Sequence, residues 1–294
     1  MNTQPVGYKA KAFEARNLII FILIALGLNW IPAAPVIFGF VSLPTETTGP
    51  VLSIAVTILF LLANISPTLA AFTVTAMTEG RSGVKSLWGR FWNRSLSIKW
   101  LLVALLFIPT VRLVANLIYR TSDGQSYPFF HYSDIWTALV TYLIAFGKNG
   151  LMEEFGWRGY ALPRLQARWN ALTSSLIVGT LVTLWHIPAM LISIGSLYQR
   201  NFWEYLCWMF MLSIVYTWVF NNTHGNVLAT VVLHAMVNTA VVWCCPDYVT
   251  TAWYLYGSHA LAAILILVIF GPKNLVRQKP AEAIAQARVH TMSD

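Results

Sequence analysis

Two adjacent glutamates and an arginine form the first group of residues that could do chemistry. Glu153 and Glu154 are followed by Arg158, four positions after Glu154. On a helix this spacing puts Glu154 and Arg158 on one face, where they can pair, while Glu153 points about 100° away. Because apolar surroundings disfavour the ionised form of a carboxylate, a separate Glu153 is suited to act as a general base. The alternative is a solvated helix end, at which both glutamates are ordinary interfacial charges.

Two histidines and an asparagine form the second group. His234 and Asn238 are four positions apart and therefore share a helix face, where they can donate two hydrogen bonds, hold a metal or stabilise an oxyanion. They could equally serve as hydrogen-bonding residues between helices. His186 is polar in an otherwise apolar stretch, and taken alone it is better explained by a bond to a backbone carbonyl than by a catalytic role. Each reading stays open until the features combine.

These residues lie in a chain of 294 residues that is 57% hydrophobic and only 10% charged. A soluble domain carries about 25% charged residues, so the composition predicts an all-α, polytopic membrane protein. A spanning helix needs about 20 mainly apolar residues, and about eight stretches reach that length. The expected fold is a bundle of about eight transmembrane helices with a polar intramembrane cavity, its helices near residues 17–41, 51–77, 99–119, 134–155, 171–194, 202–220, 227–245 and 252–270.

The net charge of +8 is explained by the membrane rather than by a nucleic-acid partner. Most of the 19 Lys and Arg residues precede the first stretch, follow the last, or lie between the second and third or the fourth and fifth. With eight spans all four groups fall on one side, which predicts that both termini are cytoplasmic. Arg112 and Lys148 fall inside spans. The Trp-rich basic segment from Trp88 to Trp100 is expected to lie at the interface and to contact anionic lipid.

The chain is expected to form a single transmembrane domain over residues 1–270, with a core at about 134–245 and a basic cytoplasmic tail over 271–294. Trp30, near a helix end, is interpreted as an interfacial anchor. His131 and His259 are assigned to or near external loops, and His290 to the tail. None of these histidines is needed for chemistry. The three cysteines have no ligand-like spacing and imply neither a disulfide framework nor a metal site.

The two groups of residues occur in the order of a known family. Glu153-Glu154-x-x-x-Arg158, then His186, then His234-x-x-x-Asn238 resemble the three motifs of the CPBP or Abi family of intramembrane proteases, the type II CAAX prenyl endopeptidases. The resemblance covers about 100 residues. The segment Trp157-Arg158-Gly159-Tyr160 extends the first motif in a way that is typical of the family. One position departs from the pattern, because Val182 stands where the family has a phenylalanine four residues before the histidine.

The resemblance implies a role for each matching residue. Glu153 would activate the attacking water, His186 would help to bind or orient it, and His234 and Asn238 would stabilise the oxyanion. Glu154 and Arg158 would support them. Zinc or another divalent metal could be held by Glu153, His186 and His234. A glutamate mechanism with fixed donors would need no metal, and the sequence leaves both open.

The leading hypothesis is therefore an integral membrane endopeptidase that hydrolyses a peptide bond near the cytoplasmic face, in a membrane-associated or prenylated, CAAX-like peptide. In a bacterium it would lie in the inner or plasma membrane. The first alternative is a non-catalytic membrane adaptor or bacteriocin-immunity protein of the same fold. The second is a proton-coupled transporter, which the lack of a sequence repeat disfavours. The substrate, the cleavage sequence and the oligomeric state are not readable from the sequence.

Overall fold

The computed structural model describes residues 14–42, 50–93, 96–123, 135–192, 197, 200–244 and 248–277. All regular structure in these ranges is helical. The helices are α1 (Ala15–Ile37), α2 (Pro50–Gly89), α3 (Ile98–Asp123), α4 (Ile135–Ala145), the π-helix η1 (Phe146–Leu151), α5 (Met152–Glu154), the π-helix η2 (Phe155–Ala161), α6 (Leu162–Gln166), α7 (Ala171–Leu191), α8 (Phe202–Asn222), α9 (Val227–Cys244) and α10 (Tyr248–Phe270).

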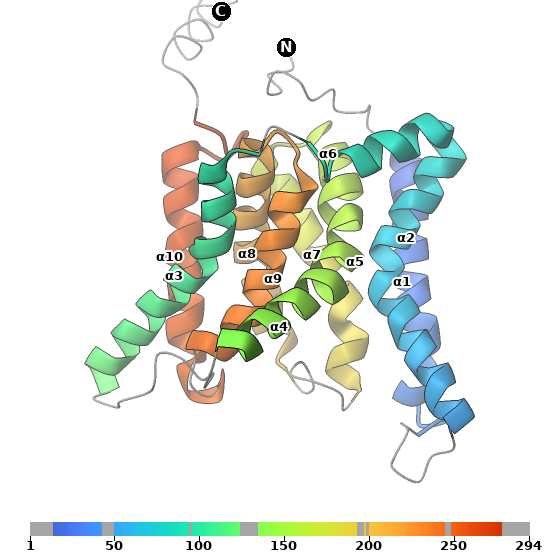
Figure 1. Cartoon of the computed structure of the whole chain (residues 1–294), viewed down its shortest axis with the longest axis horizontal. Coiled ribbons are helices and arrows are strands. Elements are labelled where there is room, and N and C mark those ends of the chain that lie inside the picture. The colour runs from blue at the N-terminus through green and yellow to red at the C-terminus, as the bar shows by residue number, and fades with distance from the viewer. Residues whose placement is uncertain are drawn as a thin grey trace, which may run out of the picture.

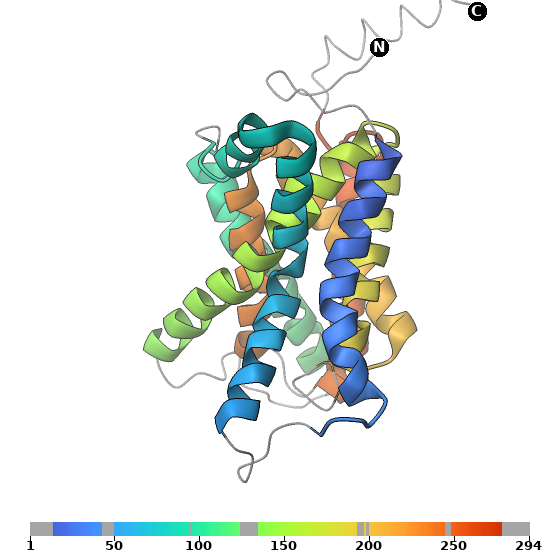
Figure 2. The same cartoon turned by 90° about the vertical axis from the view of Figure 1, so that its right-hand side faces the viewer.

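The helices form an upright bundle in which α1 begins and α10 ends at the same end (Figure 1). Within the described residues, six helices are long and apolar enough to cross a membrane: α1, the main part of α2, α3, α7, α8 and the C-terminal part of α10. The apolar stretch of α9 is shorter. The run from α4 to α6 is oblique to its neighbours in both views (Figure 2). The expectation of an all-α, polytopic membrane protein is confirmed, whereas the polar cavity stays a prediction.

Asparagine side chains cap the N-termini of several of these helices. The Oδ1 of Asn170 accepts a hydrogen bond from the backbone N–H of Thr173 at 2.8 Å, which satisfies one free donor in the first turn of α7. Asn201 does the same for α8, and Asn226 accepts from the N–H of Ala229 at the start of α9. These caps fix where the helices that carry the candidate site begin.

Pro188 lies inside α7 without ending the helix. Proline lacks an N–H, so the carbonyl of Leu184, four residues earlier, loses its helical partner. The indole Nε1 of Trp30 donates to this carbonyl at 3.1 Å, and the Nδ2 of Asn29 donates to the next one, that of Trp185, at 2.8 Å. Trp30 therefore joins α1 to α7, which is a more specific role than the interfacial anchor expected from its place in the sequence.

The chain after α10 is tied to the bundle as far as it is described. The carbonyl of Lys273 accepts a hydrogen bond from the N–H of Ala171 at 2.8 Å, and Leu275 is fully buried. The Nδ2 of Asn222 donates to the carbonyl of Leu275 at 2.7 Å. Residues 271–277 thus pack against the start of α7 and the end of α8. The rest of the expected tail lies outside the described residues. The domain boundary at 270 stays a prediction.

The expectation for His259 is wrong, because this residue lies within α10 and not in a loop. Its ring is buried, and Nδ1 is 2.8 Å from the carbonyl oxygen of Leu255. Arg112 of α3 is also fully buried. Arg112 lies within a candidate span, as expected, whereas a single histidine in an apolar run is compatible with either a loop or a buried contact. His131 and His290 lie outside the described residues.

Candidate active site

The two glutamates of the first motif lie between two π-helical segments. α5, which carries Glu153 and Glu154, is a short α-helical stretch with η1 before it and η2 after it. π-Helical turns are rare and occur frequently at functional sites, because the extra residue changes which side chains share a face. Glu153 and Glu154 are both buried, at 2% and 0% exposed. They are therefore not the solvated charges of a helix end.

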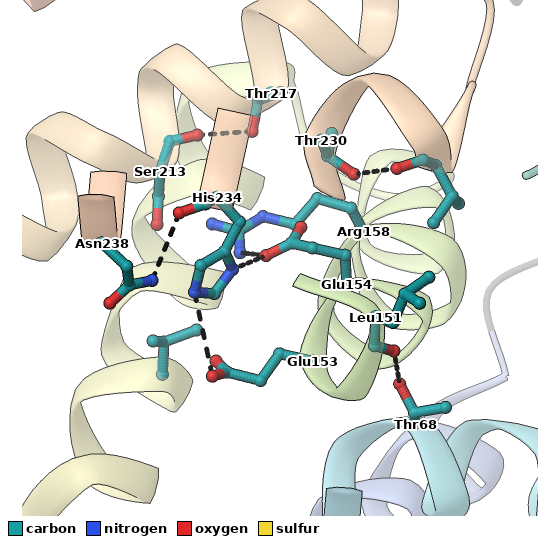
Figure 3. A network of polar contacts seen from close by, with 12 residues as sticks. Thr68, Leu151, Glu153, Glu154, Arg158, Ser213, Thr217, Thr230, His234 and Asn238 are labelled. Carbon is teal, nitrogen blue, oxygen red and sulfur yellow. Dashed lines mark hydrogen bonds and ion pairs between the residues drawn. The ribbon is translucent and has the colours of Figure 1, made fainter. Parts of the chain in front are cut away.

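Close contacts with α2 and α9 hold this segment in place. The hydroxyl Oγ1 of Thr68 donates to the carbonyl of Leu151 at 3.1 Å, at the end of η1 (Figure 3). A Cβ on Gly150 would lie 2.9 Å from the carbonyl oxygen of Val231, and a Cβ on Gly156 would lie 2.5 Å from backbone atoms of Pro67. Glycine at these two positions lets the segment approach its neighbours more closely than any other residue would allow.

Glu154 is the centre of a buried charge network. Its Oε1 accepts a hydrogen bond from Nη1 of Arg158 at 2.9 Å, as the four-residue spacing predicts, and lies 2.7 Å from Nδ1 of His234 (Figure 3). The guanidinium of Arg158 also stacks over the ring of Tyr216, 3.9 Å from its centroid. Buried charges need such partners, because a lone charge in an apolar interior is costly.

Glu153 faces the other nitrogen of the same histidine. Its Oε1 is 3.8 Å from Nε2 of His234, which makes the two groups neighbours beyond hydrogen-bond distance. The imidazole thus lies between two carboxylates, with Glu154 at Nδ1 and Glu153 at Nε2 (Figure 3). The bond to Glu154 fixes the orientation of the ring and turns Nε2 toward the Glu153 carboxylate.

Asn238 follows His234 by one turn of α9. Its Nδ2 donates to the carbonyl oxygen of His234 at 3.2 Å, and its side chain lies beside the imidazole in Figure 3. The structure therefore puts Asn238 next to the histidine of its own motif.

His186 is held by its own helix. Its Nδ1 is 2.8 Å from the carbonyl oxygen of Val182, and its ring contacts Trp185 and Tyr205 at centroid distances of 4.6 and 5.4 Å. With Nδ1 donating to this carbonyl, Nε2 is left as the nitrogen that can serve chemistry. The contact at position 182 is made by the main-chain carbonyl, so it does not depend on whether the side chain there is valine or phenylalanine.

The geometry does not favour the metal site considered from the sequence. Among the described residues, no group of three His, Cys, Asp or Glu side chains is close enough to hold a metal ion, and this includes the expected set of Glu153, His186 and His234. The Nδ1 atoms of His186 and His234 are each bonded within the protein, which leaves Nε2 as the nitrogen that either ring could offer to a ligand. As they are spaced here, the three residues do not form a three-ligand site.

Several residues that support the site could not be recognised from the sequence. Thr68 and Tyr216 come from helices distant in the chain, and an isolated Thr or Tyr in an apolar span gives no reason to select it. Gly150, Gly156 and Gly159 are different, because three glycines flanking the glutamates are unusual in a helix and could have indicated close packing.

Comparisons with known proteins agree with this site. The model of the family "Type II CAAX prenyl endopeptidase Rce1-like" matches residues 135–240, from the start of α4 to beyond Asn238. The resemblance to the CAAX protease family is confirmed. CAAX prenyl protease 2 of Methanococcus maripaludis is 28% identical over 210 residues, which cover 65% of this chain and 76% of that protein.

A second relative shares less with this chain. Lysostaphin resistance protein A of Staphylococcus epidermidis is 23% identical over 186 residues, or 63% of this chain. The chain spans about half the length of that protein, 46%. The family match contains all six motif residues, but it excludes α1 and α2, which supply Trp30, Thr68 and Pro67 to the site's surroundings.

Proposed function

We propose that this protein is an intramembrane endopeptidase that hydrolyses a peptide bond in a membrane-associated or prenylated peptide. The observation that carries the proposal is the placement of Glu153, a buried carboxylate beside an imidazole whose other nitrogen is fixed by Glu154. The family match over residues 135–240 and the name of the archaeal relative support the choice of substrate class.

In the proposed reaction, Glu153 is the general base. Its carboxylate takes a proton from a water molecule while the water oxygen adds to the scissile carbonyl carbon. The carbonyl oxygen becomes an oxyanion. Protonated Glu153 then gives its proton to the leaving amine nitrogen as the C–N bond breaks, so that a carboxyl product and an amine product result.

The histidines and Asn238 would supply hydrogen bonds around this centre. Nε2 of His234 lies on the Glu153 side of the ring. Because Nδ1–H is donated to Glu154, Nε2 carries an N–H only when the ring is an imidazolium, and in that form it would donate to an oxyanion that forms beside Glu153. Asn238 would add a second donor from the same helix face. His186, whose Nδ1 is bonded to Val182, would use Nε2 to bind or orient the water. Glu154 and Arg158 act through His234 and are positioning residues.

The test is cleavage of membrane-tethered and prenylated reporter peptides by purified protein in lipid vesicles. Glu153→Gln keeps the shape of the side chain and removes the base, so we expect a loss of about 10²-fold or more. Glu204→Gln is the matched control, because Glu204 is exposed on α8. A parallel arm with a chelator separates a metal-dependent reaction from a glutamate reaction. Absence of any Glu153-dependent cleavage would overturn the proposal and favour a non-catalytic adaptor.

A further inference from the structure

The C-terminal part of α2 lies across the end of the bundle. Gly80 has a left-handed backbone (φ 63°, ψ −160°) that turns the chain, and residues 81–92, here called the arm, run across the top in Figures 1 and 2. Leu87 and Phe91 of the arm are buried against the bundle. Arg81, Lys85 and the rings of Trp88 and Trp92 are exposed, the two rings at 49% and 63%. Apolar and basic faces of this kind are typical of helices that lie in a membrane interface.

The arm packs directly on the segment that carries the glutamates. The ring of Trp88 stacks on Phe155 with centroids 5.5 Å apart and planes 6° from parallel. Phe91 stacks on the same ring at 6.0 Å. Phe155 follows Glu154 directly, so a shift of the arm changes the surface against which the first residue of η2 is packed.

Polar contacts tie the arm to both elements of the candidate site. A guanidinium nitrogen of Arg90 donates to the carbonyl of Gly159 in η2. The carbonyl of Arg90 accepts a bond from the N–H of Val227 at 3.0 Å, at the start of α9, the helix that carries His234. Just before the arm, Glu79 pairs with Arg164 at 2.6 Å. The arm thus joins η2 and α9, and Glu79 just before it joins α6, at one end of the bundle.

We propose that the arm is a docking surface for anionic lipid headgroups, and that docking holds η2 and α9 in the arrangement needed for cleavage. Exposed Arg81 and Lys85 supply the charge that attracts anionic headgroups, and exposed Trp88 and Trp92 supply rings that favour the interface. Trp88 is partly exposed and also stacks on Phe155, so it connects the docking surface to the segment that carries the glutamates. The effect on cleavage rests on the proposed peptidase function, whereas the docking itself does not.

The experiment compares vesicles of phosphatidylcholine alone with vesicles that also contain phosphatidylglycerol. Three proteins are used: wild type, the arm variant Arg81→Gln/Lys85→Gln, and the control variant Lys273→Gln/Arg277→Gln. The control removes two exposed charges at the same end of the bundle but off the arm. Amide hydrogen exchange is measured over residues 81–92 and 155–161, and reporter cleavage is measured in the same vesicles.

With anionic lipid we expect several-fold slower exchange in both segments and several-fold faster cleavage, in wild type and the control but not in the arm variant. Added salt should reduce both effects in wild type, which tests the charge contribution even if the arm variant fails to fold. Slower exchange without cleavage would support docking and overturn the peptidase. Glu153-dependent cleavage with exchange and rate equal in both vesicles would overturn the docking and leave the peptidase standing.

Discussion

Trp30 of α1 donates its indole hydrogen bond to the carbonyl of Leu184, the one carbonyl of α7 that Pro188 leaves without a helical partner. Asn29 donates to the next carbonyl, that of Trp185. His186 follows Leu184 and Trp185, the two residues whose carbonyls accept these bonds. A helix outside the family-matched region therefore determines how the turn that presents His186 is held, and the proline and the two donors act as one unit.

Replacing Trp30 by phenylalanine should weaken this turn. The variant keeps an aromatic ring and loses the donor, so the carbonyl of Leu184 is left unsatisfied, at a cost of about 1–3 kcal/mol. We expect a lower midpoint of thermal unfolding in detergent and reduced cleavage. Trp253→Phe, at an exposed position of α10, is the matched control and should change neither. If the two variants unfolded at the same temperature and cleaved equally well, the hydrogen bond of Trp30 would contribute nothing to stability or activity.

Removing Glu154 should destabilise the protein as well as inactivate it. Glu154→Ala leaves the buried guanidinium of Arg158 without its carboxylate, which typically costs about 3–5 kcal/mol. The double variant Glu154→Ala/Arg158→Met removes both charges and should be less destabilised than the sum of the single variants, by about 1 kcal/mol or more. Thermal unfolding of the four proteins in detergent measures this coupling. Additive effects would contradict the pairing.

Alanine at position 156 should disrupt the segment that carries the glutamates. This is the opposite of the usual effect, because in a helix interior alanine is normally more stable than glycine by about 1 kcal/mol. The added Cβ would lie 2.5 Å from the backbone of Pro67, where neither helix can yield cheaply. We expect lower stability and a loss of cleavage. Gly147→Ala has no atom within 4 Å of the new Cβ and should be neutral or stabilising. If Gly147→Ala lost more stability and cleavage than Gly156→Ala, the contact between η2 and α2 would not be tight.

The basic end of the bundle should face the cytoplasm. The C-terminal end of α10 and the arm lie at one end of the bundle, and the C-terminal end of α1 lies at the other (Figure 1). Arg277 follows α10, Phe40 follows α1, and both side chains are exposed. In a cysteine-free background, Arg277→Cys should react with a membrane-impermeant thiol reagent only in inside-out vesicles, and Phe40→Cys only in right-side-out vesicles. The reverse pattern would place both termini outside and would contradict the charge rule for this chain.

The sequence predicts the parts of the site that depend on local spacing. Glu154 and Arg158 pair because four residues make one helical turn, and the eight apolar stretches become helices because their length and hydropathy leave few alternatives. The relation between the two glutamates is different. They point apart from each other, yet both reach His234, from α9. Spacing within one helix cannot show that a third side chain lies between them.

The remaining gaps have physical causes as well. Hydropathy does not distinguish a π-helix from an α-helix, so η1 and η2 could not be predicted. The sequence assigns His259 to or near an external loop, because a single polar residue indicates either a loop or a buried contact and only packing separates the two. Trp30 looked like an anchor for the same reason, since its partner lies 154 residues away in the chain.

The π-helical turns also affect how this stretch of the chain can change in length. Each carries a wider turn than an α-helix, so a residue lost from η1 could be absorbed by reverting to α-helical bonding without breaking the helix. Side chains on the two sides of the deletion would then keep their faces, whereas the same loss from an α-helical turn would rotate one side by about 100° relative to the other. Glu153 and Glu154 would stay on their present faces. Homologous chains that lack one residue in η1 should therefore keep both the bundle and the reaction.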